Sequence, residues 1–329
     1  MVSLQTNYMG LKLRNPIIVG SSSLTSTVEK VKELEKHNAG AVVLKSLFEE
    51  QIRYEIHQSM HQTSLSDSYY PEAHDYISNY SRTHHIDNYL KVISDCKKAV
   101  SIPVIASINC VTADEWTAFA KRIEDAGADA LELNIFILPA DPNISGEENE
   151  KMYFDILDQV KKEMDIPVAM KISYHFSGLA KTALKLSWAG ANGMVLFNRF
   201  YSPDINVDNM KVIPAHVFST PDEISVSLRW VAMLSDHLHC DIAASTGIHD
   251  GKSVVKQLLA GAKAVQIAST LYINGLGRID EMLKYLEEWM VKHGYKSTDE
   301  FIGKLSLKKA ENPAAWERVQ FMKHFAGIE

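Results

Sequence analysis

The feature that most constrains the fold is a repeated alternation of short apolar segments with longer amphipathic segments. Eight short segments are rich in apolar and β-branched residues, and each precedes a segment with helical apolar spacing. The expected strands occupy 16–22, 41–47, 103–110, 130–137, 167–173, 193–199, 241–247 and 264–270. The expected helices occupy 28–38, 86–100, 113–127, 149–164, 177–190, 222–238, 251–262 and 277–294. The pattern predicts eight βα units.

Nearly continuous hydrophobic strands indicate burial on both faces, which is typical of parallel sheets. Eight such units predict an α/β fold, a closed (β/α)8 TIM barrel. A doubly wound open sheet is the alternative, but it would need a phosphate fingerprint such as GxGxxG after the first strand, and GSSSLT at 20–25 is not one. We expect one barrel domain over 1–329, with an N-terminal hairpin before the first strand.

The tail over 295–329 is expected to be a helical extension, because WERVQFMKHF reads as an accessory helix. Its role is either packing on the barrel or an oligomer contact. Three segments that follow strand ends are long, namely 48–85, 138–148 and 200–221. Long segments at this face are usually lids or binding loops.

Charge and cysteine usage exclude several classes of partner. The chain has 34 basic and 41 acidic residues, a net charge of -7 and no dense basic run, which argues against nucleic acid and favours a small molecule. Cys96, Cys110 and Cys240 lie far apart without a CxxC pair, which argues against metal sites and suits a reducing cytosol. No leader pattern and no apolar run near ~18 residues is visible, so a cytoplasmic protein without a membrane span is expected.

Lys45 and Lys171 each fall near the end of an otherwise apolar strand. An unpaired buried ammonium is costly, so each needs an anionic or strongly polar partner. A lysine that emerges into solvent or pairs with a nearby carboxylate is the alternative. Two lysines at equivalent strand ends favour a ligand, because barrel active sites lie at the carboxyl ends of the strands.

Asn134 and Asn198 end the fourth and sixth strands, where an amide can donate and accept hydrogen bonds or cap a turn. Gly247 and Gly251 follow the seventh strand in STGIHDGKS, and the eighth strand reads AVQIAST. Barrels often bind phosphate at the loops after strands seven and eight, although either glycine alone would more often be a plain turn residue. The location predicts a phosphate site.

These segments resemble the dihydroorotate dehydrogenase family of FMN-binding barrels, in its soluble branch, over residues 4–306. The resemblance is carried by GLKLRNPIIVGSS, AVVLKSL, PVIASI, DALELNI, PVAMKIS, GANGMVLFN, SLRWV, STGIHDGKSVVKQLLAGAKAVQIAST and HGYKSTDEFIGKL, in the family's order and spacing. It implies an FMN-dependent oxidoreductase acting on CH–CH groups, such as dihydroorotate to orotate in pyrimidine biosynthesis.

The resemblance also implies site residues. Cofactor positions would be Gly20, Ser21, Ser22, Lys45, Ser46, Asn134, Lys171, Asn198, Ser219, Thr220, Gly247, Ile248, Ala268 and Ser269. Substrate positions would be Lys45, Asn79, Asn134, Asn198 and Arg199, with Lys45 and Asn134 in the catalytic set. A cation at Lys171 would stabilise the negative charge that reaches a reduced flavin.

Three departures from the family affect the substrate side. Family members carry Cys or Ser as the base that takes a proton from C5 of dihydroorotate, and Ile137 stands at that position. The substrate loop reads HDYISNYSRTHH, in which Asn79 is a weak counterpart of the family's Asn. Arg199 replaces a small hydroxyl residue and would either clamp a carboxylate or form a salt bridge at the loop mouth.

Two other functions stay open. One is a related flavin-dependent reductase or dehydrogenase of another dihydropyrimidine-like substrate, working with a separate electron-transfer partner, since the sequence has neither a Cys cluster nor an NAD fingerprint. The other is a flavin-binding barrel that has lost catalysis. A homodimer is compatible with either.

Overall fold

The computed structural model describes residues 2–48, 86–109, 117–199, 202–313 and 316, and within them the strands close into a parallel barrel. The barrel strands are β3 (Ile17–Val19), β4 (Ala41–Val43), β6 (Val104–Asn109), β7 (Ala130–Asn134), β8 (Val168–Ile172), β9 (Gly193–Leu196), β12 (Asp241–Ser245) and β13 (Ala264–Ile267). Val42 of β4 pairs with Val104 of β6 and closes the ring. The predicted TIM barrel is confirmed.

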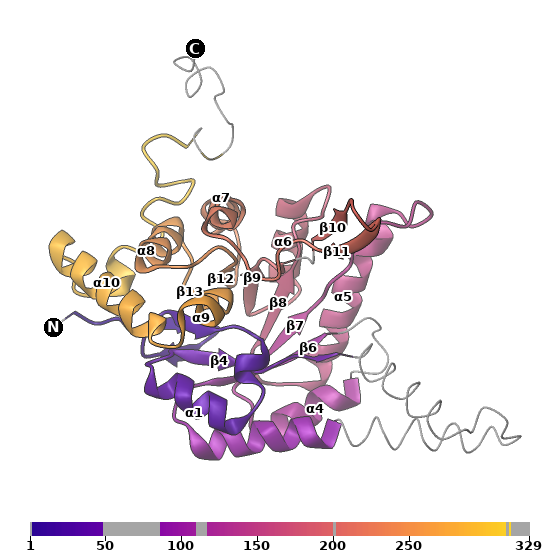
Figure 1. Cartoon of the computed structure of the whole chain (residues 1–329), viewed down its shortest axis with the longest axis horizontal. Coiled ribbons are helices and arrows are strands. Elements are labelled where there is room, and N and C mark those ends of the chain that lie inside the picture. Colours follow the sequence, from indigo (N-terminus) through magenta and orange to yellow (C-terminus); the bar gives the residue numbers. More distant parts are fainter. Residues whose placement is uncertain (1, 49–85, 110–116, 200–201, 314–315, 317–329) are drawn as a thin grey trace, which may run out of the picture.

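Helices follow the strands and surround the barrel (Figure 1). They are α1 (Val28–Lys36), a helix over 86–99, α4 (Thr117–Asp125), α5 (Gly146–Glu163), α6 (Leu179–Trp188), α7 (Ile224–Leu234), α8 (Gly251–Ala260) and α10 (Arg278–His293). Their starts follow from local chemistry, because Thr27 accepts a hydrogen bond from the Lys30 N–H and Ser145 forms a capping box with Glu148. Each predicted helix is present within a few residues of its expected bounds.

An amino-terminal hairpin of β1 (Thr6–Tyr8) and β2 (Leu11–Leu13) fills the amino end of the barrel. Small residues line that part of the interior, where Ala130, Ala169 and Ala243 pack around the buried Tyr8 and Met9. A Cβ atom on Gly193 would lie 2.7 Å from the Met9 sulfur, so the hairpin and the strand approach too closely for a side chain there. The hairpin predicted from the sequence is therefore the plug of the barrel.

The 200–221 segment contains a second hairpin, β10 (Pro203–Asn206) paired with β11 (Lys211–Pro214), which the sequence pattern did not indicate. Other short elements of the described residues are β5 (Leu47–Phe48), η1 (Ser23–Thr25), η3 (Pro221–Glu223), α9 (Ser269–Asn274) and η4 (Thr298–Glu300). The 138–148 segment leads from β7 into α5.

Residues 295–313 turn back across α7 and α8. The N–H of Gly303 donates to the Leu258 carbonyl at 2.8 Å, and the N–H of Leu307 donates to the Ala232 carbonyl at 2.9 Å. This part of the tail packs on the barrel, which is one of the two roles considered for it. The predicted accessory helix lies outside the described residues except for Trp316, and the 48–85 segment lies outside them except for Phe48.

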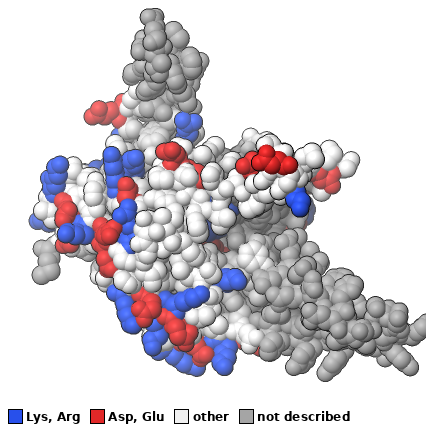
Figure 2. All heavy atoms as spheres, in the orientation of Figure 1, with Lys and Arg blue, Asp and Glu red and all other residues white. Residues whose placement is uncertain are grey.

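Acidic and basic side chains are mixed over α1 and α10 on the face shown in Figure 2. Within the described part of the chain, every helix is too short or too polar to traverse a lipid bilayer.

Candidate functional site

A cavity of about 330 Å³ opens at the carboxyl ends of the barrel strands. Its lining combines polar side chains and backbone from the loops that follow the strands, as expected for a barrel active site. The predicted site residues in its wall are Gly20, Ser21, Ser22, Lys45, Ser46, Asn134, Lys171, Asn198, Arg199, Ser219, Gly247, Ile248, Ala268 and Ser269. Further wall residues are Ser23, Phe48, Phe197, Ser245, Thr246, Gln266 and Ile267.

The strand register brings the polar strand ends together. Asn134 of β7 lies directly opposite Lys171 of β8, and Asn198 follows the next strand, β9. The Asn198 amide donates to the Ile135 and Lys171 carbonyls, both at 3.1 Å, and its side chain is buried. Asn198 therefore ties the strand ends together with its donor group.

The Asn134 amide has a different environment. Its Oδ1 atom is buried, and no group in the described part of the chain donates a hydrogen bond to it. Leaving such an acceptor unpaired costs ~1–3 kcal/mol, and Asn134 belongs to the cavity wall, so a ligand donor that reaches this amide would remove that cost.

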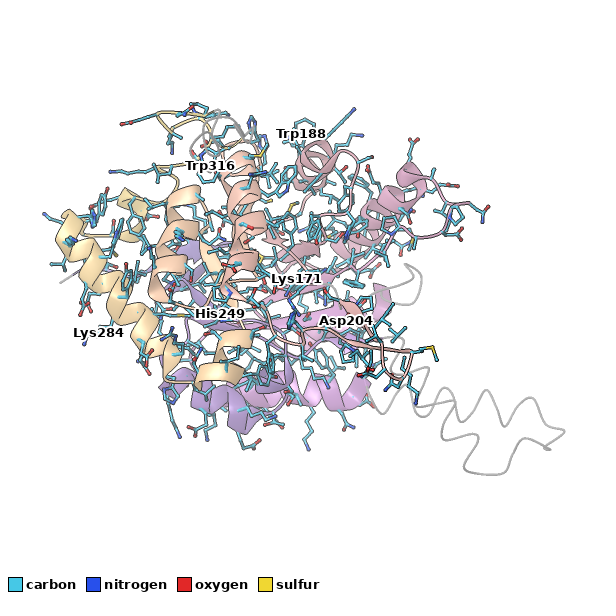
Figure 3. The ribbon with its side chains drawn as sticks, turned by 45° about the horizontal axis from the view of Figure 1, so that its top comes forward. Lys171, Trp188, Asp204, His249, Lys284 and Trp316 are labelled. Carbon is cyan, nitrogen blue, oxygen red and sulfur yellow. The ribbon has the colours of Figure 1, made fainter. Side chains whose placement is uncertain are left out.

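Lys171 lies in the centre of the molecule, within the ring of strands, whereas Trp188 and Lys284 lie at its periphery (Figure 3). Its Nζ donates to Gln266 Oε1 at 2.9 Å and lies 3.4 Å from Glu132 Oε1. The Lys171 side chain is 12% exposed and the Glu132 side chain 1% exposed. Lys171 thus pairs with a nearby carboxylate, which is the alternative arrangement considered for it, and it also lines the cavity.

A chain of hydroxyl groups supports the opposite wall. The Oγ atoms of Ser21 and Ser46 lie 2.9 Å apart, and those of Ser46 and Ser107 lie 2.7 Å apart. The Tyr89 hydroxyl accepts from the Ser107 N–H at 2.7 Å and donates to its carbonyl. Burial raises the pKa of Tyr89 well above its usual value, so this phenol remains protonated and can serve as a fixed anchor.

The loops after β12 and β13 approach the cavity through their backbone. Gly247 has a φ of 76°, and a Cβ atom there would lie 2.1 Å from the Ile224 nitrogen, so only glycine fits. The Ser219 N–H donates to Ser269 Oγ at 3.0 Å, which joins the segment before α7 to the loop after β13. Because β12 and β13 are neighbouring strands, residues from the loops after both line adjacent parts of the cavity wall.

His249 lies in the loop after β12 and was not predicted as a site residue from the sequence. Its Nε2 lies 3.0 Å from Ser219 Oγ, and its carbonyl accepts from Arg278 Nε at 2.9 Å. Burial lowers the pKa of His249 below its usual value. A neutral imidazole therefore holds the Ser219 hydroxyl in place at neutral pH.

Arg199 adopts the salt-bridge arrangement. Its Nε donates to Glu223 Oε2 at 2.9 Å, and its Nη1 donates to the His216 and Val217 carbonyls, both at 3.0 Å. Nη2 lies 3.4 Å from Glu223 Oε1. With most of its five N–H groups engaged, the guanidinium fastens the loop over 216–223 and has little capacity left for a bidentate carboxylate.

Two other predicted positions do not line the cavity in the described structure. Thr220 does not line it in the described structure and instead caps η3, where its N–H donates to Glu223 Oε1 at 2.8 Å. Ile137 is half-buried and packs against the hydrophobic core. Phe136 and Leu138 on either side are 39% and 59% exposed. Asn79 lies outside the described residues.

The fold and the cavity define an α/β-barrel protein with a polar cavity at the carboxyl ends of its strands. A sequence profile of the family described as dihydroorotate dehydrogenase matches residues 73–290. The match covers most of the chain, so this chain belongs to the dihydroorotate dehydrogenase family. The resemblance inferred from the motifs is confirmed, and with it the assignment as an oxidoreductase that acts on CH–CH groups.

Individual relatives are similar over nearly their whole length. One is the dihydroorotate dehydrogenase B (NAD(+)) catalytic subunit of Thermoplasma volcanium, 28% identical over 312 residues that cover 92% of this chain and 98% of that protein. The protein of the same name from Pyrococcus abyssi is 28% identical over 315 residues, which cover 93% of this chain and 99% of that protein. At this level of identity the substrate side of the site can differ.

Proposed function

We propose that this chain is an FMN-dependent oxidoreductase that acts on a CH–CH bond of a small cyclic amide. The observation that carries the proposal is the polar cavity at the carboxyl ends of the strands, with Lys171 and Asn134 in its wall and no donor to Asn134 Oδ1 among the described residues. A flavin edge offers both an N–H donor for the Asn134 oxygen and a site where negative charge accumulates on reduction.

The cavity residues fit this cofactor. The backbone of Gly247, Ile248, Ala268 and Ser269 would hold the phosphate, as in other barrels with phosphate sites after strands seven and eight. The wall formed by Gly20, Ser21 and Ser22 would line the isoalloxazine and ribityl portions. When bound, FMN supplies a two-electron acceptor. Lys171 would orient it and supply a fixed positive charge near the reacting ring.

Dihydroorotate is the substrate that the family suggests, and it is the first candidate. Two residues expected to act on that substrate, Ile137 and Arg199, do not suit it. Ile137 has no group that can accept a proton, so this position cannot supply a base for C5. The Arg199 guanidinium is engaged by Glu223 and by two carbonyls. We therefore propose as the second candidate a dihydropyrimidine-like substrate that lacks a carboxylate or takes its base from another residue.

Electron transfer to the final acceptor would use a separate protein. The Thermoplasma volcanium and Pyrococcus abyssi relatives are named as catalytic subunits of an NAD(+)-dependent enzyme. This chain carries neither an NAD fingerprint nor a Cys cluster of its own. A flavoprotein or iron–sulfur partner would supply those groups.

The test is anaerobic stopped-flow reduction of the FMN-loaded protein by dihydroorotate, dihydrouracil and dihydrothymine. Reduction at roughly 10 per second by one of these supports an enzyme, and the preferred compound separates the two candidates. If none of these compounds reduces the flavin in a protein that still binds FMN, the result would support a flavin-binding barrel that has lost catalysis.

A further inference from the structure

A buried carboxylate lies just behind the cavity and has no role in the function proposed above. Glu132 is the third residue of β7, and its side chain is on the same strand face as Ala130, which packs in the barrel interior. The residue is 1% exposed and does not line the cavity in the described structure.

Glu132 is held by residues from two other strands. Gln266 of β13 donates from Nε2 to Glu132 Oε2 at 2.5 Å, and Lys171 Nζ of β8 lies 3.4 Å from Oε1. Gln266 Oε1 in turn accepts from Lys171 Nζ at 2.9 Å. The three side chains form a closed triangle in which each contacts the other two.

Lys171 and Gln266 line the cavity, whereas Glu132 lies beyond them. The anion is therefore screened from the ligand by the cation that it partners. Tyr8 lies deeper in the barrel. Its burial, and to a smaller extent the negative charge of Glu132, raises the pKa of Tyr8 well above its usual value. The phenol stays neutral, so it adds no charge to the barrel interior.

We propose that Glu132, with Gln266, is a positioning residue that fixes Lys171 and limits the positive charge that the cavity presents to the flavin ring. This inference rests on the proposed FMN site. Lys171 alone would favour negative charge on the ring, and a carboxylate directly behind it opposes that effect. The pair would set the flavin potential below the value that an isolated lysine would give.

The experiment measures the midpoint potential of bound FMN in the full chain by anaerobic reductive titration. Glu132→Gln keeps the size of the side chain and removes its charge. We expect the equilibrium constant for two-electron reduction to rise at least about tenfold, which is ~30 mV for a two-electron couple. Glu150→Gln is the matched control, because Glu150 accepts from Thr182 on the outer helices, and it should leave the potential unchanged.

Glu132→Asp is the second variant, in case Glu132→Gln does not fold. It keeps the charge but withdraws the carboxylate from Lys171, so the potential should rise by less than in Glu132→Gln. An unchanged potential in folded, FMN-loaded Glu132→Gln would overturn the inference, and where only Glu132→Asp folds, an unchanged potential in Glu132→Asp would overturn it. Failure of the parent chain to bind FMN would instead overturn the proposed function.

Discussion

The Arg199 guanidinium and the Glu223 carboxylate form an ion pair that joins the end of β9 to η3, with Nε 2.9 Å from Oε2. The same guanidinium holds the His216 and Val217 carbonyls. The segment between Val217 and Glu223 contributes Ser219 to the cavity wall. Arg199 thus holds one wall of the cavity in place.

Glu223→Gln should loosen this wall and weaken FMN binding. The pair is partly exposed, with side chains 21% and 33% accessible, so we expect a loss of about 1 kcal/mol, or roughly fivefold in Kd. Fluorescence titration of the apoprotein with FMN measures it. Glu33→Gln, which removes an exposed pair with Lys36, is the control and should not alter Kd. Equal Kd values in Glu223→Gln and the parent would contradict the fastening role.

The pH dependence of the stability of the folded protein should depend on His249, which lies in the loop after β12. Burial lowers its pKa in the folded protein, while an unfolded histidine titrates near ~6.5. The folded state binds fewer protons at His249 than the unfolded state does. The contribution of His249 to the free energy of unfolding is therefore fully present above pH ~6.5, and it is lost as the pH falls through the lowered pKa of the folded state.

Melting temperatures at pH 7.5 and 5.0 test this prediction. The parent should lose more stability between the two values than His249→Gln, in which the titrating group is absent. His237→Gln changes an exposed histidine and should retain the pH dependence of the parent. The same loss in His249→Gln as in the parent would show that other groups are responsible.

The barrel could be predicted from the sequence because its signals are local: each strand is a short apolar run, and each helix has its own apolar face. Strand-end residues such as Asn134 and Lys171 were also predictable once the barrel was assigned. Glu132 and Gln266 were missed, although a charged or amide residue within an apolar strand is a usable signal. The Arg199 pairing could not be chosen over a carboxylate clamp, since its partner Glu223 lies on a separate element.

Lys171→Ala should affect electron transfer more than cofactor binding. Removing the ammonium takes away the positive charge that is proposed to lie beside the flavin ring, so the flavin potential should fall and reduction by substrate should slow by about 10²-fold. Ser219→Ala is a useful comparison, because it alters a neutral group next to His249 and should change FMN affinity more than reduction rate. If substrate reduced the flavin of Lys171→Ala as fast as that of the parent, Lys171 would have no role in electron transfer.

Ile137→Cys restores a proton acceptor at the family's base position. If the missing base limits the reaction, dihydroorotate-dependent reduction should increase, up to the roughly 10²–10⁴-fold typical of a positioned general base. The gain should be greatest at alkaline pH, where more of the thiol is ionised. Leu138→Cys places the same group one residue further along and should give no gain. A parent protein that already reduces its flavin with dihydroorotate at about 10 per second would contradict the premise.

The most direct test of the central claim is equilibrium binding of FMN to the apoprotein, followed by its visible spectrum and fluorescence. We predict a yellow protein with one non-covalent FMN per chain. Gly247→Ala should weaken that binding severely, because its Cβ would lie 2.1 Å from the Ile224 nitrogen and displace the loop after β12, which is proposed to hold the phosphate. A folded parent protein that remains colourless and takes up no FMN on reconstitution would contradict the account.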